Sequence, residues 1–131
     1  MAITHNGSCL CGAIEYSMEG PLRGVVACHC TQCRKQSGHY FAATNVADER
    51  LIVSGSENLT WYKASDEAKR GFCKTCGSIL FWKHKDDAFT SVMAGGLDGE
   101  TGLEIEKHIF CADKGDYYTI ADSRPQFQGN G

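Results

Sequence analysis

The residues whose types and spacing point most directly to chemistry are three cysteines in the stretch Cys28-His29-Cys30-Thr31-Gln32-Cys33. We call Cys28, Cys30 and Cys33 the cysteine trio. If Cys28 and Cys30 end a strand, their side chains share one face of it and His29 points to the other. Three converging thiolates form a metal site that lacks one protein ligand, and a catalytic zinc typically leaves its fourth position to water or substrate. The trio therefore predicts an open, catalytic zinc site.

Four further cysteines occur as two close pairs, which we call the cysteine quartet: Cys9 with Cys11, and Cys73 with Cys76. Two pairs can close a tetrahedral structural zinc site, in which Zn–S bonds of about 2.3 Å place the sulfur atoms about 3.8 Å apart. Gly12 and Gly77 stand where such tight turns need a permissive backbone. Spacing alone leaves open a different partition, in which Cys9 or Cys11 completes the site of the trio.

A short helix is expected to position the last member of the trio. Thr31 can act as its N-cap, Ser37 as its last residue and Gly38 as its stop. Cys33 then lies in the first turn, where unpaired N–H groups and the helix dipole favour a thiolate.

The rest of the chain predicts an all-β fold of mainly antiparallel short strands with this one short helix. Residues 13–19 and 104–111 alternate between apolar and polar side chains, as half-buried strands do. A polar turn or loop with solvated charges is expected over residues 65–70, and residues 124–131 are expected to fray. Further extended segments are predicted at residues 23–28, 40–46, 51–53, 59–62, 78–84 and 89–94.

Length and charge limit the possible classes of protein. The 131 residues predict a single domain over residues 1–131, with a core from about 5 to 125. The 13 basic and 16 acidic residues give a net charge of −3 without a basic cluster, so nucleic-acid binding is not expected. The sequence contains no run of about eighteen apolar residues, so no membrane span is predicted.

Cysteine usage bears on the compartment. The chain begins without a signal-peptide pattern, so we expect a cytoplasmic protein whose eight cysteines are reduced. The alternative is an exported domain with four disulfides, which is disfavoured because cysteines two residues apart pair poorly with each other.

The cysteine motifs, taken in order, carry a family resemblance. Seven cysteines with matched spacing resemble the glutathione-dependent formaldehyde-activating enzyme family over roughly residues 5 to 125. Gly96-Leu97-Asp98 and His108-Ile109-Phe110 also resemble the family pattern, whereas Cys111 lies outside it. The segments that carry the resemblance are Gly7-Ser8-Cys9-Leu10-Cys11-Gly12, Cys28 to Arg34 with Ser37-Gly38, and Phe72-Cys73-Lys74-Thr75-Cys76-Gly77-Ser78.

The resemblance implies a β-tent fold with two zinc sites. The quartet, Cys9, Cys11, Cys73 and Cys76, would hold a structural zinc, and the trio would hold a catalytic and more labile one. The implied activity is that of a carbon–sulfur lyase that joins formaldehyde to its co-substrate glutathione as S-hydroxymethylglutathione. The sequence leaves open whether glutathione or another small thiol adduct is the substrate, and it leaves the oligomeric state open.

The residues support this chemistry independently of the family. An open site of three thiolates prefers a fourth sulfur ligand, and a thiol bound to a metal loses its proton. Arg34 and Lys35 are candidate anchors for the carboxylates of glutathione, although they could equally be two exposed helix charges. Because it alternates away from the cysteines, His29 is expected to be packed rather than to bind metal. His39 is a weak candidate proton donor.

Two alternatives remain at this stage. The chain could be a non-catalytic, zinc-stabilised interaction module, as in the related centromere protein V class, with His29, His39 or Cys111 as a fourth ligand for the trio. It could also be a thiol-redox protein that uses Cys30 and Cys33 as a C-x-x-C pair. That hypothesis leaves Cys28 unexplained and lacks the expected βαβ context.

Overall fold

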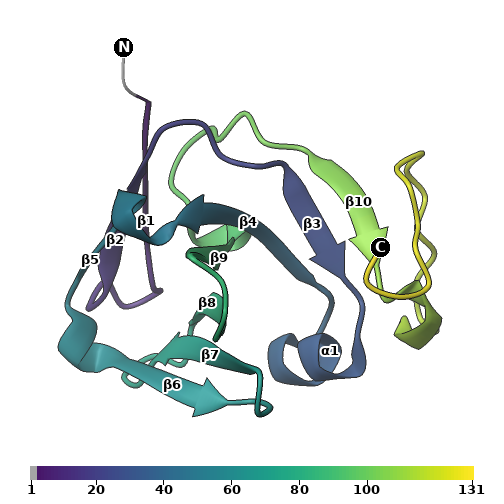
Figure 1. The fold of residues 1–131 in the computed structure, drawn as a ribbon, viewed down its shortest axis with the longest axis horizontal. Coiled ribbons are helices and arrows are strands. Elements are labelled where there is room, and N and C mark those ends of the chain that lie inside the picture. The colour runs from purple at the N-terminus through teal and green to yellow at the C-terminus, as the bar shows by residue number, and fades with distance from the viewer. Residues whose placement is uncertain (1–2) are drawn as a thin grey trace. The chain divides into compact units, whose positions relative to one another are not determined.

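The computed structural model describes residues 3–131, which form ten short β-strands, one α-helix and four short 3-10 turns (Figure 1). The prediction of a mainly β fold with one short helix is confirmed. The described chain divides into two compact units. The first unit contains the described residues up to Arg23 together with Thr44–Gly102, and the second contains Gly24–Ala43 and Leu103–Gly131. The expectation of a single domain stays a prediction.

Two antiparallel sheets build the first unit, in the strand orders β1-β2-β5 and β9-β8-β7-β6. Side chains from both sheets meet in one apolar core. For example, the rings of Tyr16 and Phe81 lie edge to face at 5.3 Å, and Met18 and Val92 are wholly buried beside them. The strands are β1 (Thr4–Ser8), β2 (Glu15–Glu19), β5 (Leu51–Ser54), β6 (Leu59–Lys63), β7 (Ala68–Cys73), β8 (Ile79–His84) and β9 (Phe89–Met93).

The second unit places its strands in the order β10-β3-β4. Strand β3 (Val25–Cys28) is central: it pairs parallel with β10 (Ile105–Ile109) and antiparallel with the first three residues of β4 (Phe41–Ala47), whose remaining residues belong to the first unit. Helix α1 (Thr31–Ser37) follows β3 and precedes β4 (Figure 1). The helix ends at Gly38, whose φ of 85° is the left-handed conformation that glycine adopts without strain. The predicted end of the helix is therefore confirmed.

The end of the chain is ordered, so the prediction that residues 124–131 fray is wrong. The backbone of this segment pairs with β10 and the residue that follows it. His108 N–H donates to Pro125 O at 2.9 Å, Phe127 N–H donates to His108 O at 2.9 Å, and Phe110 N–H donates to Gly129 O at 2.7 Å. Backbone pairing along the edge of a sheet needs no side-chain periodicity, which is why the sequence pattern missed it.

Two other local expectations differ from the structure. The segment predicted as a solvated turn over residues 65–70 contains the start of β7, and Arg70 is only 3% exposed. Strand β7 pairs on both sides, with β6 and with β8, and this double pairing buries alternate side chains even where they are charged. Strand β1 was not predicted, because its residues Thr-His-Asn-Gly-Ser carry no apolar alternation. Across residues 3–131, no helix is both long enough and apolar enough to cross a membrane.

Candidate functional site

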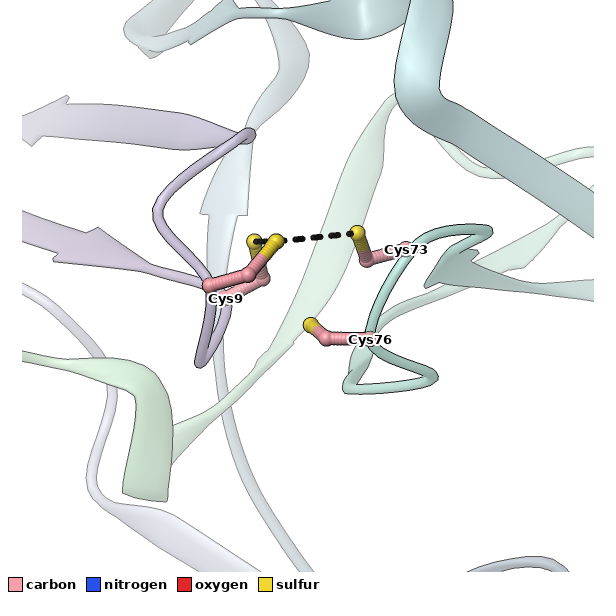
Figure 2. A group of neighbouring side chains, drawn as sticks. Cys9, Cys73 and Cys76 are labelled. Atoms are coloured by element: carbon pink, nitrogen blue, oxygen red, sulfur yellow. Dashed lines mark hydrogen bonds between the residues drawn. The ribbon is translucent and has the colours of Figure 1, made fainter.

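The cysteine quartet assembles at two turns of the first unit. Cys9 and Cys11 lie in the turn between β1 and β2, Cys73 ends β7, and Cys76 lies in the turn before β8. Figure 2 shows Cys9 facing Cys73 and Cys76 from the opposite turn. The sulfur atoms of Cys9 and Cys11 are 3.7 Å apart, and those of Cys11 and Cys73 are 3.8 Å apart. These distances match the edge of a tetrahedral zinc–thiolate site, so the four residues fit a zinc ion.

Local backbone geometry explains how the two turns present their sulfurs. Gly12 and Gly77 have φ values of 81° and 80°. Their N–H groups donate to Cys9 O and Cys73 O, which closes each turn around its pair of cysteines. A residue with a Cβ atom would be strained at either glycine.

Hydrogen bonds also favour ionised sulfur at Cys9 and Cys76, two of the four quartet residues. Ile14 N–H donates to Cys9 Sγ at 3.3 Å. The Ser78 hydroxyl lies 3.2 Å from Cys76 Sγ, and this hydrogen bond is the largest cause that lowers the pKa of Cys76 to about 5. A thiolate with such a pKa is available as a metal ligand at neutral pH. Cys9 and Cys73 are almost fully buried in the apolar core, at 3% and 0% exposure.

The cysteine trio assembles where β3 ends and α1 begins. Its three sulfur atoms lie within 4.8 Å of one another. The predicted N-cap, Thr31, is wrong: the N-cap is Cys30, with φ −66° and ψ 160°. The Cys30 sulfur takes the place of the usual hydroxyl or carboxylate by accepting a hydrogen bond from Cys33 N–H at 3.3 Å. Because β3 ends at Cys28, the cap and the first helical turn, rather than strand alternation, bring the other two sulfurs to Cys28.

The electrostatic interactions among the three thiols of the trio favour the binding of a cation. The side chains of Cys30 and Cys33, in that order of effect, raise the pKa of Cys28 far above the usual value for a thiol. Three thiolates at this separation repel one another, and the positive charge of a bound divalent cation would offset that repulsion and so favour the ionised form of all three. Within residues 3–131, no fourth cysteine, histidine or carboxylate joins the trio in a cluster of possible ligand atoms. The described residues therefore offer three possible ligands at the trio.

His29 is packed and turned away from metal binding, as the sequence predicted. Its side chain is fully buried, and both ring nitrogens are engaged by other groups. Nδ1 contacts the hydroxyl of Tyr118, and Nε2 lies 2.9 Å from Nδ1 of His108. Burial is the largest cause that lowers the pKa of His29 to about 4, so the ring is neutral at neutral pH.

Both candidate anchors lie in the last turn of α1. Arg34 is half-buried, and its Nε–H donates to Asp113 O at 2.9 Å, whereas Lys35 is exposed. The exposed His39 lies 2.6 Å, through Nδ1, from the hydroxyl of Tyr117. The segment 111–118 is thus hydrogen-bonded to two residues that follow the trio in the chain, Arg34 and His39. The role of Arg34 and Lys35 in binding glutathione stays a prediction.

Several residues around the trio were missed from the sequence. These residues are His108, Tyr117, Tyr118 and Asp122. Their partners in the fold are 14 to 89 residues away along the chain, and no local pattern marks such pairs.

Known proteins resemble this chain over most of its length. The family model described as glutathione-dependent formaldehyde-activating enzyme matches residues 4–113. A protein of Schizosaccharomyces pombe, described as an uncharacterized lyase, is 29% identical over 126 residues, which cover 94% of this chain and 90% of that protein. A crystal structure of a Rhodobacter sphaeroides protein superposes with a TM-score of 0.62 at 29% identity, over 73% of this chain and 90% of the other. The family match spans both cysteine groups and confirms the resemblance drawn from the sequence: the chain belongs to the glutathione-dependent formaldehyde-activating enzyme family.

Proposed function

We propose that this protein is a zinc-dependent carbon–sulfur lyase that forms S-hydroxymethylglutathione from glutathione and formaldehyde, or handles a related adduct of a small-molecule thiol. The observation that carries the proposal is the cysteine trio, in which three sulfurs converge and no fourth ligand from the described residues joins them. Membership of the family and the lyase relative support a reaction of this type.

The reaction requires a thiolate and an aldehyde to be held together. The thiolate sulfur adds to the carbonyl carbon, a carbon–sulfur bond forms, and the carbonyl oxygen takes up a proton to become the hydroxyl of the adduct. A zinc ion held by Cys28, Cys30 and Cys33 would lower the pKa of a thiol in its fourth position, so that the thiolate is present at neutral pH. Holding both reactants in one site raises their effective concentration.

The protein's own groups supply orientation and charge. A thiolate substrate adds negative charge beside the trio, and the nearby cations Arg34 and Lys35 offset it. One guanidinium donor of Arg34, Nε–H, is used by Asp113 O, which fixes the plane of the group. We assign the terminal N–H groups of Arg34 to a glutathione carboxylate, for which a planar guanidinium is well suited.

The quartet has a structural role in this proposal. Its zinc joins two turns that are far apart in the sequence, whereas the zinc of the trio is catalytic and exchangeable. Such sites need reduced thiols, and the eight cysteines form no disulfide, so we place the protein in the cytoplasm. We propose neither nucleic acid nor membrane as a partner.

Cobalt substituted at the trio tests the proposal directly, because thiolate ligation changes the visible spectrum of cobalt. Glutathione should shift this spectrum, and S-methylglutathione, which has no thiol to ionise, should not. The same preparation reconstituted with zinc should form S-hydroxymethylglutathione from formaldehyde and glutathione. An unchanged spectrum at saturating glutathione would mean that a protein group closes the fourth position, and the protein would then be a zinc-stabilised interaction module.

A further inference from the structure

Three lysines stand side by side across one sheet of the first unit. Lys63 in β6 is paired with Lys69 in β7, and Lys69 is paired with Lys83 in β8. Directly paired residues of antiparallel strands project their side chains on the same face, where like charges repel one another. We call these three residues the lysine row. Local arrangements that cost stability are expected mainly at functional or strained sites.

The positive charges of the lysine row are compensated unequally. Lys83 is mostly buried, and its Nζ lies 2.7 Å from Asp48 Oδ2. Lys63 Nζ lies 3.7 Å from Asp66 Oδ1, but the two side chains are 74% and 95% exposed, so this ion pair contributes little. Lys69 contacts an aromatic ring and, among residues 3–131, no carboxylate. Lys63 and Lys69 are therefore available to an anionic ligand.

Trp61 borders the lysine row and adds an apolar surface to it. Its ring lies over Gly71, where an added Cβ atom would approach the ring to 3.1 Å, and Lys69 Nζ lies 4.4 Å from the centre of the ring. The side chain of Trp61 is 37% exposed. Trp61 and the lysine row line a hollow of about 470 Å³ together with residues 65–68 and Lys85. Its lining contains four lysines and two carboxylates, so the hollow favours an anion.

Strand β6 also has a free edge. Strand β7 pairs with one side of β6, and no strand within residues 3–131 pairs with the other side (Figure 1). Hydrogen bonds to β7 and its extension mark both ends of β6. Lys74 N–H donates to Asn58 O at 2.8 Å, and Ala64 N–H donates to Ala68 O at 3.2 Å. These two bonds fix the phase of the ladder between β6 and β7.

The phase of the ladder shows which backbone groups of β6 point to the free edge. Hydrogen-bonded pairs in an antiparallel ladder recur at every second residue, so Thr60 and Tyr62 bond to β7. The N–H and C=O groups of Trp61 and Lys63 then point away from β7. Tyr62, on the opposite face of the strand from Trp61, is 57% exposed. Both faces of β6 thus present an aromatic side chain beside unpaired backbone groups, a pattern that suits the addition of another strand.

We propose that the edge of β6 binds an extended acidic segment of a partner protein, which adds a strand to this sheet. The backbone of the segment pairs with the N–H and C=O groups of Trp61 and Lys63, and a carboxylate on the face of the lysine row pairs with Lys63 and Lys69. Charge complementarity selects this occupant. A neutral strand would leave the repulsion within the lysine row uncompensated, and a basic strand would increase it. The inference goes beyond the proposed function, because every residue that carries it lies in the first unit and none belongs to the cysteine trio.

Amide hydrogen exchange of the 15N-labelled protein tests the edge directly. In the free protein, the amides of Trp61 and Lys63 should exchange faster than those of Thr60 and Tyr62, which are bonded to β7. The probe is a blocked octapeptide of alternating threonine and glutamate, which carries its carboxylates on one face when extended. The peptide should slow exchange at Trp61 and Lys63 and leave Thr60 and Tyr62 nearly unchanged. Unchanged exchange at Trp61 and Lys63 with excess peptide would overturn the inference.

The role of the lysine row is tested by charge reversal. Binding of the peptide can be followed by the fluorescence of Trp61 in a Trp82→Phe background, where Trp61 is the only tryptophan. At low salt, Lys63→Glu and Lys69→Glu should each weaken binding by about fivefold, the upper range for an exposed ion pair. Lys74→Glu makes the same change in net charge at the other end of the β6–β7 pair, and it should have little effect. A peptide with lysine in place of glutamate should bind the double variant better than it binds the unmodified protein.

A modified peptide separates strand addition from simple attraction between charges. The same glutamate peptide N-methylated at every residue keeps its carboxylates but has no backbone N–H to donate, so it should bind much more weakly. Equal binding of the two peptides would reduce the site to an anion-binding hollow and overturn strand addition. Absence of binding would also overturn the inference and would leave the lysines as groups that keep other strands from the edge. Slowed exchange at Trp61 that grows with protein concentration, without peptide, would identify a second copy as the occupant and overturn it as well.

Discussion

The two cysteine groups should respond differently to the same chemical change, cysteine to serine. Cys73→Ser removes a quartet ligand that is fully buried in the apolar core and stands 62 residues from its neighbour Cys11. Cys30→Ser removes a trio ligand whose partners lie within a few residues of it in the chain. A metal that joins distant residues restricts the unfolded chain more than one that joins near neighbours.

The size of the difference follows from the lengths of the closed loops. For a cross-link across about 62 residues, the chain-entropy relation gives about 4 kcal/mol at 25 °C. For the loop of about five residues in the trio, the same relation gives about 2 kcal/mol. We therefore expect Cys73→Ser to cost about twice as much stability as Cys30→Ser. A loss of about 4 kcal/mol is a large part of the 5–15 kcal/mol that is typical of folded domains.

Tryptophan fluorescence during urea unfolding is a suitable assay. Both tryptophans of the chain, Trp61 and Trp82, lie in strands of the first unit, which also contains the quartet. Cys73→Ser should shift this transition strongly to lower urea, and Cys30→Ser should shift it by no more than about half as much. Cys111→Ser, at a cysteine outside both groups, is the matched control and should have little effect. Equal shifts for Cys73→Ser and Cys30→Ser would refute the division into a structural and an open site.

Four further predictions concern separate features. Mild chelation should remove one zinc per chain and leave the fluorescence of Trp61 and Trp82 unchanged; simultaneous loss of two zincs with unfolding would contradict this. Arg34→Ala should weaken glutathione binding to the cobalt-substituted protein by about 1–3 kcal/mol, measured by spectral titration, while Lys74→Ala, a control distant in sequence, should not. Asp48 accepts hydrogen bonds from Lys83 and Thr90, and the bond from Lys83 is the main cause of its lowered pKa. At a pH above the usual aspartate pKa of 3.8, Asp48→Asn should therefore lower the unfolding free energy. The difference in unfolding free energy between the variant and the unmodified protein should disappear as the pH falls through the lower pKa of Asp48 in the folded protein. A difference that does not depend on pH would contradict this prediction. The hydroxyl of Tyr16 is buried with no hydrogen-bond partner among residues 3–131, and burial is the main cause that raises its pKa to about 12. Tyr16→Phe should therefore raise the unfolding free energy by about 1 kcal/mol. This gain in stability should grow above pH 10.

The sequence predicted the parts of the site that are local. Cysteines two or three residues apart can only lie close together, so spacing predicted the trio and each pair of the quartet, whereas the meeting of the two pairs, 62 residues apart between Cys11 and Cys73, was one of the partitions that spacing left open. The short helix was predicted with its C-terminal end at Gly38. Its start was misplaced because a sulfur atom, rather than the hydroxyl of Thr31, accepts the capping hydrogen bond. N-cap preferences are based on oxygen acceptors, and Cys30 is not among them.

The features that the sequence could not predict join residues that are far apart along the chain. The pairing of the terminal segment with β10 is made by backbone groups, which every residue carries. The contacts of His29 with His108 and Tyr118 join residues 79 and 89 positions apart. Polar side chains at such separations show no periodicity, so only the folded chain identifies them as partners.

The way each cysteine group is assembled also suits its proposed role, which is structural for the quartet and catalytic for the trio. Cys9 and Cys73 belong to the apolar core of the first unit, so loss of a zinc bound there, as proposed, would disturb the same side chains that stabilise that unit. Cys28 and Cys30 are only partly buried, and their positions are set by the end of β3, the N-cap of α1 and the backbone bond from His29 to Ile109. The strand end and the bond from His29 involve no cysteine sulfur, whereas the N-cap is the sulfur of Cys30 itself. If the trio acts as proposed, the group in its fourth position could exchange without disturbing a hydrophobic core, as repeated turnover at a catalytic site would require.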